Sequence, residues 1–307
     1  MLQSTDFGVL TLEDANAPAL ADNFYVDESL GQKLCVELDF DARNKTTGSK
    51  NNENATSIPQ HILVAPVHYE SGYSYPLLVW LHDSCNDERQ LLRIMPQISL
   101  QNYVAVAPRG KAVAVAISAD ASYNYVDNWD DFSITALLKH TNHHKTSYDW
   151  FLDNDGISAA ERSVFDSIFV AKKSCNVAAN RIFIGGVGSG GTMALRLALL
   201  YPEYFAGVAA FDSPIPNNTN IFCHWSTARN LAVFLGLKQA DKISSATFSG
   251  MLELFYSAGF KLTVRDYQAD TGKNVKDLPK QILQEVNRWM MAIVCDENDQ
   301  KSEIADQ

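Results

Sequence analysis

The feature that most constrains this chain is a regular alternation of short apolar runs and amphipathic segments from about residue 61 to residue 294. Apolar runs bounded by turn residues are typical of buried strands, and three of them stand at 61–69 (HILVAPVHY), 76–82 (PLLVWLH) and 103–108 (YVAVAP). Residues 88–101, between the last two runs, carry apolar side chains at helical spacing. Strands that alternate with helices predict an α/β fold with a mostly parallel sheet and helices on both faces.

The same alternation continues through the C-terminal half. We expect further strands at 181–185, 206–211, 231–235 and 261–267, and helices at 159–174, 192–200, 245–258 and 278–294. Ser158 followed by Glu161 matches a capping box, which predicts that the first of these helices begins after Ser158. The strands and helices from 58 to 295 are therefore expected to form one domain.

Two stretches lie outside this alternation. Residues 1–57 are predicted to be an N-terminal extension with one strand at 33–40 and a polar linker at 41–57, which has little apolar surface to bury. Residues 111–157 interrupt the alternation after the third apolar run, where loops from the carboxyl ends of strands carry functional sites, so we expect a cap or lid there. Residues 296–307 are predicted to be an acidic tail.

Composition excludes some classes of partner. A formal net charge of −11 argues against a nucleic-acid partner, because phosphate binding requires concentrated Lys and Arg. The first 20 residues lack the basic and apolar regions of a signal peptide, and no apolar run is long enough to cross a bilayer. We therefore predict a cytoplasmic protein with no membrane span.

The sequence predicts neither a metal site nor a cofactor. The five cysteines are odd in number and form no C-x-x-C pair, which favours reduced thiols over disulfides or zinc. His140 and His144 would share one face of a helix, but no nearby carboxylate completes a metal motif. A solvated segment of the cap is the favoured interpretation of these histidines.

The most informative segment is RIFIGGVGSGGTMALRLALLYPEYFAGVAAFDSP at residues 181–214. Together with PLLVWLHD and YVAVAPRG, it resembles the carboxylesterase/phospholipase and polyhydroxybutyrate-depolymerase-like branches of the α/β-hydrolases. That family has a nucleophile elbow, in which a strand, Gly-x-Ser-x-Gly-Gly and an Ala/Leu-rich helix follow one another. The resemblance covers residues 58–295 and implies an α/β-hydrolase fold with the cap inserted at 111–157. Aligned on Gly190 and Gly191, it places Gly188 at the position of the serine nucleophile.

Other elements of the family pattern are altered as well. The family's His-Gly-x-Gly oxyanion loop reads His82-Asp83-Ser84-Cys85 here, and a carboxylate beside a developing oxyanion is repulsive. The position of the acidic residue holds Gln239, and Asp241 fits only with one inserted residue.

The resemblance also implies a histidine after the last strand, but the loop after 261–267 reads QADTGKNVKD. All seven histidines lie earlier in the chain: His61, His68, His82, His140, His143, His144 and His224. Without an imidazole at that position, a serine has no ordinary general base.

Three functional hypotheses remain open. The first is a catalytically degenerate member that keeps the scaffold to bind a small-molecule ligand or a protein partner, or to self-associate. Its pocket would lie at the oxyanion-loop residues His82, Asp83 and Cys85, together with Ser189. The chain would then not be an enzyme.

The second hypothesis is a carboxylic-ester hydrolase with Ser189 as a shifted nucleophile. Its base would come from Asp241 or from the cap histidines His140, His143 and His144. One step around a tight turn rotates the side chain away, however, and a small residue is also common at the start of a helix.

The third hypothesis is nucleotide or phosphate binding at the Gly186–Gly191 turn. This turn satisfies Gly-x-Gly-x-x-Gly, follows a strand and opens a helix, and Asp212 ends the next strand. Several strands precede the turn, whereas a nucleotide domain normally begins with this unit.

Overall fold

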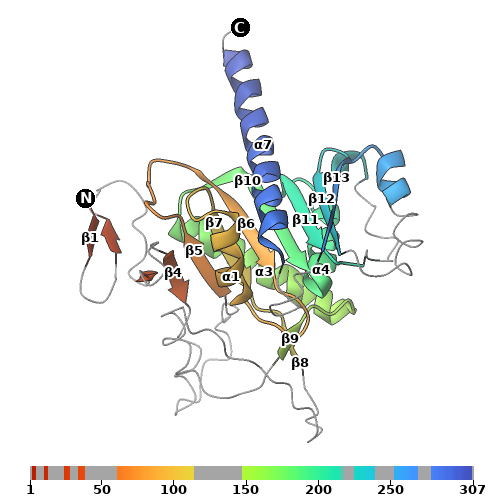
Figure 1. The fold of residues 1–307 in the computed structure, drawn as a ribbon, viewed down its shortest axis with the longest axis horizontal. Coiled ribbons are helices and arrows are strands. Elements are labelled where there is room, and N and C mark those ends of the chain that lie inside the picture. The colour runs from red at the N-terminus through yellow and green to blue at the C-terminus, as the bar shows by residue number, and fades with distance from the viewer. Residues whose placement is uncertain are drawn as a thin grey trace, which may run out of the picture.

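The computed structural model of the 307-residue chain describes residues 61–113, 147–214, 216, 225–238, 252–268 and 278–305, together with four short strands nearer the N-terminus. The strands of its central sheet are β3 (Phe24–Asp27), β4 (Leu34–Leu38), β5 (His61–Ala65), β6 (Tyr75–Leu81), β7 (Val104–Pro108), β10 (Val177–Val187), β11 (Gly207–Phe211), β12 (Ala232–Lys238) and β13 (Lys261–Tyr267). They are arranged in the order β13-β12-β11-β10-β6-β7-β5-β4-β3 (Figure 1).

The sheet is mostly parallel, as the sequence predicts. Every neighbouring pair from β7 across to β13 is parallel, whereas β5, β4 and β3 are added antiparallel at the other edge. All residues of β5, β6, β7 and β11 are buried, which explains why these strands read as continuous apolar runs. Strands β3 and β4 come from the predicted extension and join this sheet. The division into extension and domain stays a prediction.

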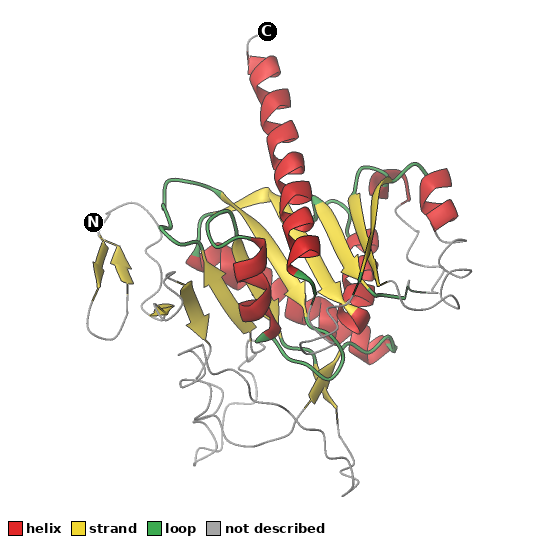
Figure 2. Cartoon of the chain, in the orientation of Figure 1, coloured by secondary structure: helices red, strands yellow, loops and turns green. Residues whose placement is uncertain are grey.

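Helices cover both faces of the sheet (Figure 2). On one face lie α1 (Gln90–Ile98) and α7 (Lys280–Ala305), and on the other lie α3 (Asn154–Ser174) and α4 (Gly188–Leu200). Each face encloses its own hydrophobic cluster. Met95, Val286 and Met290 pack in the first. Val164 and Met193 pack in the second. The α/β prediction with helices on both faces is confirmed.

The smaller elements lie outside the main sheet. Strand β1 (Leu2–Ser4) pairs with β2 (Leu10–Leu12), and α5 (Trp225–Ala228) is a single turn. Residues 252–257 are helical, within the helix expected at 245–258. None of the helices in the described part of the chain is long and apolar enough to cross a membrane.

Three helix boundaries differ from expectation. The predicted capping box at Ser158 is wrong, because α3 begins one turn earlier and its N-cap is Asp153. The Asp153 carboxylate accepts a hydrogen bond from the Gly156 backbone N–H at 2.6 Å. Helix α4 starts at Gly188 instead of residue 192, and α7 continues through much of the predicted acidic tail to Ala305.

The described ends of the predicted cap form a small antiparallel ladder. Strand β8 (Lys111–Val113) pairs with β9 (Ser147–Asp149), and Asn86 forms a bridge with Tyr148. Strand β9 therefore lies beside the loop that follows β6. The polar linker at 41–57 and residues 114–146 of the cap lie outside the described residues.

Candidate functional site

The turn between β10 and α4 is packed closely against neighbouring backbone. A Cβ built on Gly186 would lie 2.6 Å from the carbonyl oxygen of Leu81, and one built on Gly190 would overlap the carbonyl oxygen of His82. At Gly191 it would overlap the hydroxyl oxygen of Ser213. Glycine is required here because the start of the helix approaches the ends of two strands without room for a side chain.

Gly188 is the first residue of α4 and has φ +54°, in the left-handed region that favours glycine. A Cβ at this position would overlap Oδ1 of Asp83, which belongs to the loop after β6. A side chain at Gly188 would therefore be strained, as the serine of a nucleophile elbow is, and it would also overlap the Asp83 carboxylate. The resemblance noted above places the serine nucleophile at this same position.

The Asp83 carboxylate is held in place by its own loop. Its Oδ1 accepts a hydrogen bond from the Ser84 backbone N–H at 2.7 Å. The Asp83 N–H donates to Oε1 of Gln90 at 3.2 Å, and the same Oε1 accepts from the Trp80 indole at 3.0 Å. A backbone donor of the expected oxyanion loop is thus bonded to a carboxylate of the chain itself.

His82 is fully buried beneath this loop and both of its ring nitrogens are bonded. Nε2 accepts the Gly110 backbone N–H at 3.0 Å, so the ring proton lies on Nδ1 and is donated to the Asp83 carbonyl at 2.9 Å. Burial lowers the pKa of His82 and keeps the ring neutral. Since neither nitrogen faces Ser189 in these contacts, His82 supports the loop rather than a nucleophile.

Two serines and a carboxylate meet beside the turn. The Ser189 hydroxyl donates to Oδ1 of Asp149 at 2.5 Å, and the Ser84 hydroxyl lies 3.1 Å from the same oxygen and 3.0 Å from the Ser189 hydroxyl. The Trp150 backbone N–H donates to this oxygen at 2.7 Å. Asp149 ends β9, so the return of the predicted cap is tied directly to the start of α4.

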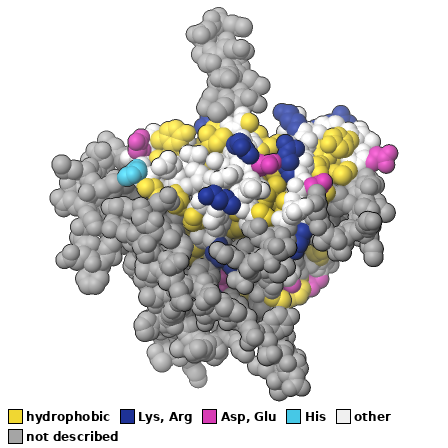
Figure 3. All heavy atoms as spheres, viewed as in Figure 1, with side chains coloured by type: hydrophobic (Ala, Val, Ile, Leu, Met, Phe, Trp, Pro, Cys, Tyr) yellow, Lys and Arg dark blue, Asp and Glu magenta, His cyan; other side chains and the backbone are white. Residues whose placement is uncertain are grey.

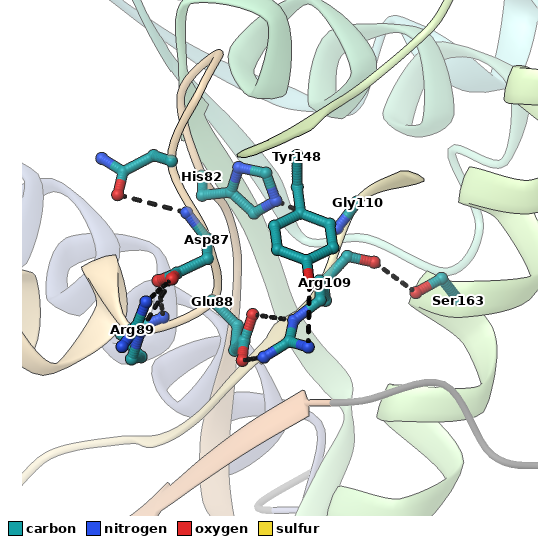
Figure 4. A network of polar contacts seen from close by, with 9 residues as sticks. His82, Asp87, Glu88, Arg89, Arg109, Gly110, Tyr148 and Ser163 are labelled. Atoms are coloured by element: carbon teal, nitrogen blue, oxygen red, sulfur yellow. Dashed lines mark hydrogen bonds and ion pairs between the residues drawn. The ribbon is translucent and has the colours of Figure 1, made fainter. Parts of the chain in front are cut away.

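An ion pair between Arg109 and Glu88 packs against Tyr148 of β9 (Figure 4). Nε of Arg109 donates to Glu88 at 2.5 Å, and the guanidinium lies 4.7 Å from the centre of the Tyr148 ring. Burial alone would lower the pKa of Arg109, but the ion pair with Glu88 outweighs burial and raises it. The Trp150 indole donates to the His82 carbonyl at 3.0 Å, which closes the network over the loop.

A second carboxylate lies at the carboxyl end of β11. Asp212 has φ +49°, and its oxygens accept from the Tyr267 hydroxyl at 2.5 Å and from the Lys238 backbone N–H at 2.8 Å. Burial, and then Asp212, raise the pKa of Tyr267. Tyr267 ends the last strand, just before the loop where the resemblance implies a histidine.

The candidate site is rich in hydrogen-bond acceptors. The start of α4 has no side-chain cap, and the carboxylates of Asp83 and Asp149 both contact its first turn, where the helix dipole stabilises negative charge. These two carboxylates would repel a phosphate or an oxyanion at the same place. The charge of the site opposes both anion binding and stabilisation of a tetrahedral oxyanion.

The structure brings Asp83, Gly188 and Ser189 together and leaves Cys85 beside them, exposed and with φ +61°. Asp241 and the cap histidines lie outside the described residues. Sequence reasoning missed Asp149, because nothing in KTSYDW marks its carboxylate as a partner of a serine 40 residues away. No group of three or more His, Cys, Asp or Glu side chains in the described part of the chain could hold a metal ion.

Comparison with known protein families shows which family the chain belongs to. The model of the Phospholipase/Carboxylesterase family matches residues 77–290, which contain most of β6, the elbow and the first part of α7. The chain belongs to this family. The predicted α/β-hydrolase membership is therefore confirmed, and the turn at Gly188 lies inside the matched region. No curated protein matches the chain in a search by sequence.

Several solved structures share the fold. A ferulic acid esterase superposes with a TM-score of 0.51 at 12% identity, and the match covers 88% of this chain and 96% of the esterase chain. The Bacillus cereus carboxylesterase superposes with a TM-score of 0.50 at 15% identity, and the match covers 78% of this chain and 96% of the carboxylesterase chain. SOBER1 of Arabidopsis thaliana has a TM-score of 0.50 at 17% identity, covering 72% and 100%. At these identities the likeness concerns the fold alone.

Proposed function

We propose that this chain is a catalytically degenerate member of the phospholipase/carboxylesterase family, in which the scaffold serves binding or assembly and not ester hydrolysis. One observation carries the proposal: the elbow residue is Gly188 in a left-handed conformation, and the space beside it holds the Asp83 carboxylate. The elbow mechanism needs an oxygen nucleophile at that point and a donor pair for the oxyanion. Here residue 188 has no oxygen nucleophile, and the loop that would supply oxyanion donors carries the negative charge of Asp83.

The proposal is tested with an activated-serine probe and with esters. We expect no stoichiometric labelling by a fluorophosphonate and no turnover of short- or medium-chain p-nitrophenyl esters. Gly188→Ser should not restore activity, because its side chain would meet Asp83 and the described residues supply no imidazole to activate it. The double variant Gly188→Ser/Asp83→Ala removes the steric conflict and should still be inactive. Turnover by either variant would contradict the proposal.

A second candidate function is an ester hydrolase that uses Ser189. The observation in its favour is the 2.5 Å hydrogen bond from the Ser189 hydroxyl to Asp149, which gives this serine a carboxylate partner. The same Asp149 oxygen already accepts from the Trp150 N–H and lies 3.1 Å from the Ser84 hydroxyl. This arrangement fixes the serine rather than freeing its oxygen for attack.

The matched variants Ser189→Ala and Ser84→Ala separate this candidate from the first. Both lose a hydroxyl from the same cluster, but only Ser189→Ala removes the proposed nucleophile. Labelling that is abolished by Ser189→Ala and retained in Ser84→Ala would favour hydrolysis. Equal absence of labelling in the wild type and in both variants would support the degenerate role.

Nucleotide binding at the Gly186–Gly191 turn is the least favoured candidate. Asp83 and Asp149 occupy the start of α4, where a phosphate would have to bind. Both carboxylate oxygens of Asp212 already accept hydrogen bonds. We expect no thermal stabilisation by millimolar nucleotide, and a clear stabilisation would contradict this argument.

A further inference from the structure

Helix α3 lies on the side of the sheet away from α1 and α7 (Figure 1), and its aromatic residues Phe165 and Phe169 form, with Tyr201 and Tyr204, what we call its aromatic surface. Phe169 is 66% exposed, whereas Val164 and Ile168 of the same helix are buried. One turn earlier, Phe165 packs edge-on against Tyr201 and Tyr204, with ring centres 5.2 and 5.3 Å apart. Tyr204 is itself 48% exposed. Aromatic side chains in this setting are typical anchors of protein interfaces.

This aromatic surface lies apart from the candidate site. Figure 3 shows the α1 and α7 face, on which Lys, Arg, Asp and Glu side chains are interspersed with apolar ones in the described residues. Phe169 lies in the C-terminal half of α3, whereas the candidate site lies at the start of α4. Contact at α3 therefore does not require access to Gly188.

We infer that the α3 surface binds a second copy of this chain, through an antiparallel α3–α3 contact centred on Phe169. A twofold axis through Phe169 brings the residue k positions before it opposite the residue k positions after it on the partner helix. In this register Asp166 faces Lys172 of the second copy, and this pair occurs twice. Phe165 faces Lys173, which is suited to a cation–π contact.

The charge pattern of α3 makes this register self-complementary. Lys172 and Lys173 are exposed in its last turn, and Asp166 is half-buried before Phe169. Opposite charges therefore meet on both sides of the Phe169 contact, and like charges do not. Helix α3 has 21 residues, so it offers about 30 Å of length for such a contact. Helix pairs of this size bury less area than a standard interface, so we expect a reversible dimer with micromolar affinity.

The inference extends the proposed function, since it names self-association as the role that the scaffold retains. Its test is the oligomeric state of the full-length protein, measured by sedimentation velocity from about 1 to 200 µM, a range that spans micromolar affinity. We expect a monomer–dimer equilibrium for the wild type. Phe169→Ser should raise the dissociation constant at least tenfold. Tyr256→Ser is the matched control, because Tyr256 is 60% exposed on another helix and its loss should leave the equilibrium unchanged.

Charge reversal tests the register. Asp166→Lys and Lys172→Asp should each weaken the dimer, and the double variant should restore it, because the facing pairs become opposite again. A wild type that stays monomeric, or a dimer that Phe169→Ser leaves intact, would overturn the inference. A double variant as weak as the single ones would overturn the register. None of these results changes the ester assays, so failure of this inference and failure of the degenerate role are distinguishable.

Discussion

The conflict between Gly188 and Asp83 predicts a measurable coupling between residues 105 positions apart. Gly188→Ala forces alanine into a left-handed conformation, which costs about 1–2 kcal/mol. Its Cβ also displaces the Asp83 carboxylate and breaks the bond from the Ser84 N–H, which costs about 1.5–3 kcal/mol for a hydrogen bond to a charged group. The expected total is a loss of about 2.5–5 kcal/mol in unfolding free energy.

A double-mutant cycle with Asp83→Ala separates the cost of displacing the carboxylate from the cost of the backbone conformation. In an Asp83→Ala background the carboxylate is absent, so Gly188→Ala should cost only the backbone part of about 1–2 kcal/mol. The coupling energy should therefore be about 1.5–3 kcal/mol, with the double variant more stable than the sum of the single effects predicts. Urea unfolding followed by far-UV circular dichroism gives each value, provided that the m-value is unchanged.

Two other glycines provide matched controls for this cycle. Gly259 has φ +78° and no neighbour within 4 Å of a built Cβ, so Gly259→Ala reports the backbone cost alone. Gly72 also has open space around it and no positive φ, so Gly72→Ala should change stability by less than about 0.5 kcal/mol. The reasoning is refuted if Gly188→Ala costs no more than Gly259→Ala, or if Asp83→Ala leaves the cost unchanged.

Three further predictions concern the surroundings of the site. Burial lowers the folded-state pKa of His82, so stability should fall as pH drops below the unfolded value of about 6.5, and unfolding measured from pH 5 to 7.5 should lose this slope in His82→Gln. The raised pKa of Tyr267 gives the opposite dependence on pH: its contribution to the free energy of unfolding is present below about pH 10 and is lost as the pH rises above that value. Tyr267→Phe removes the hydrogen bond to Asp212, so unfolding of this variant should no longer show that alkaline loss. Glu88→Gln breaks a buried ion pair and should cost about 3–5 kcal/mol in urea unfolding, whereas Glu285→Gln breaks an exposed one and should cost no more than about 1 kcal/mol; equal losses would contradict the burial argument.

Much of the fold follows from the sequence because the buried strands carry continuous apolar runs. The strand expected at 261–267 is observed at Lys261–Tyr267. Strand β10 extends beyond the expected 181–185 at both ends, because the polar residues Asn180 and Arg181 interrupt the apolar run near its start and Gly186 interrupts it near its end. The start of α3 was misplaced because Ser158 offered a local capping pattern, while Asp153 makes the cap that forms. Two nearby residues could each cap this helix, and which of them does so depends on where the folded backbone begins the helix.

The candidate site was less accessible to sequence reasoning. The glycines of the elbow form a local motif, so the turn at Gly188 could be predicted from its neighbours. The contact from Asp149 to Ser189 depends on β9 pairing with β8, which brings the return of a long excursion back to the sheet. No spacing rule predicts such a contact. The Tyr267–Asp212 bond likewise joins the ends of two strands that are separated in the sheet by β12.

The arrangement at the elbow also explains why we expect Gly188→Ser alone not to produce a working site. A side chain at Gly188 requires the Asp83 carboxylate to move, and its departure leaves the Ser84 N–H without the acceptor that now holds it. The turn itself does not depend on a serine, because Gly186, Gly190 and Gly191 fix the approach of α4 to the strands whatever residue stands at 188. The fold can therefore keep the shape of a nucleophile elbow without a serine at residue 188. The proposed degenerate role requires no more than this, since it leaves the packing of the turn intact and a surface such as α3 available for binding.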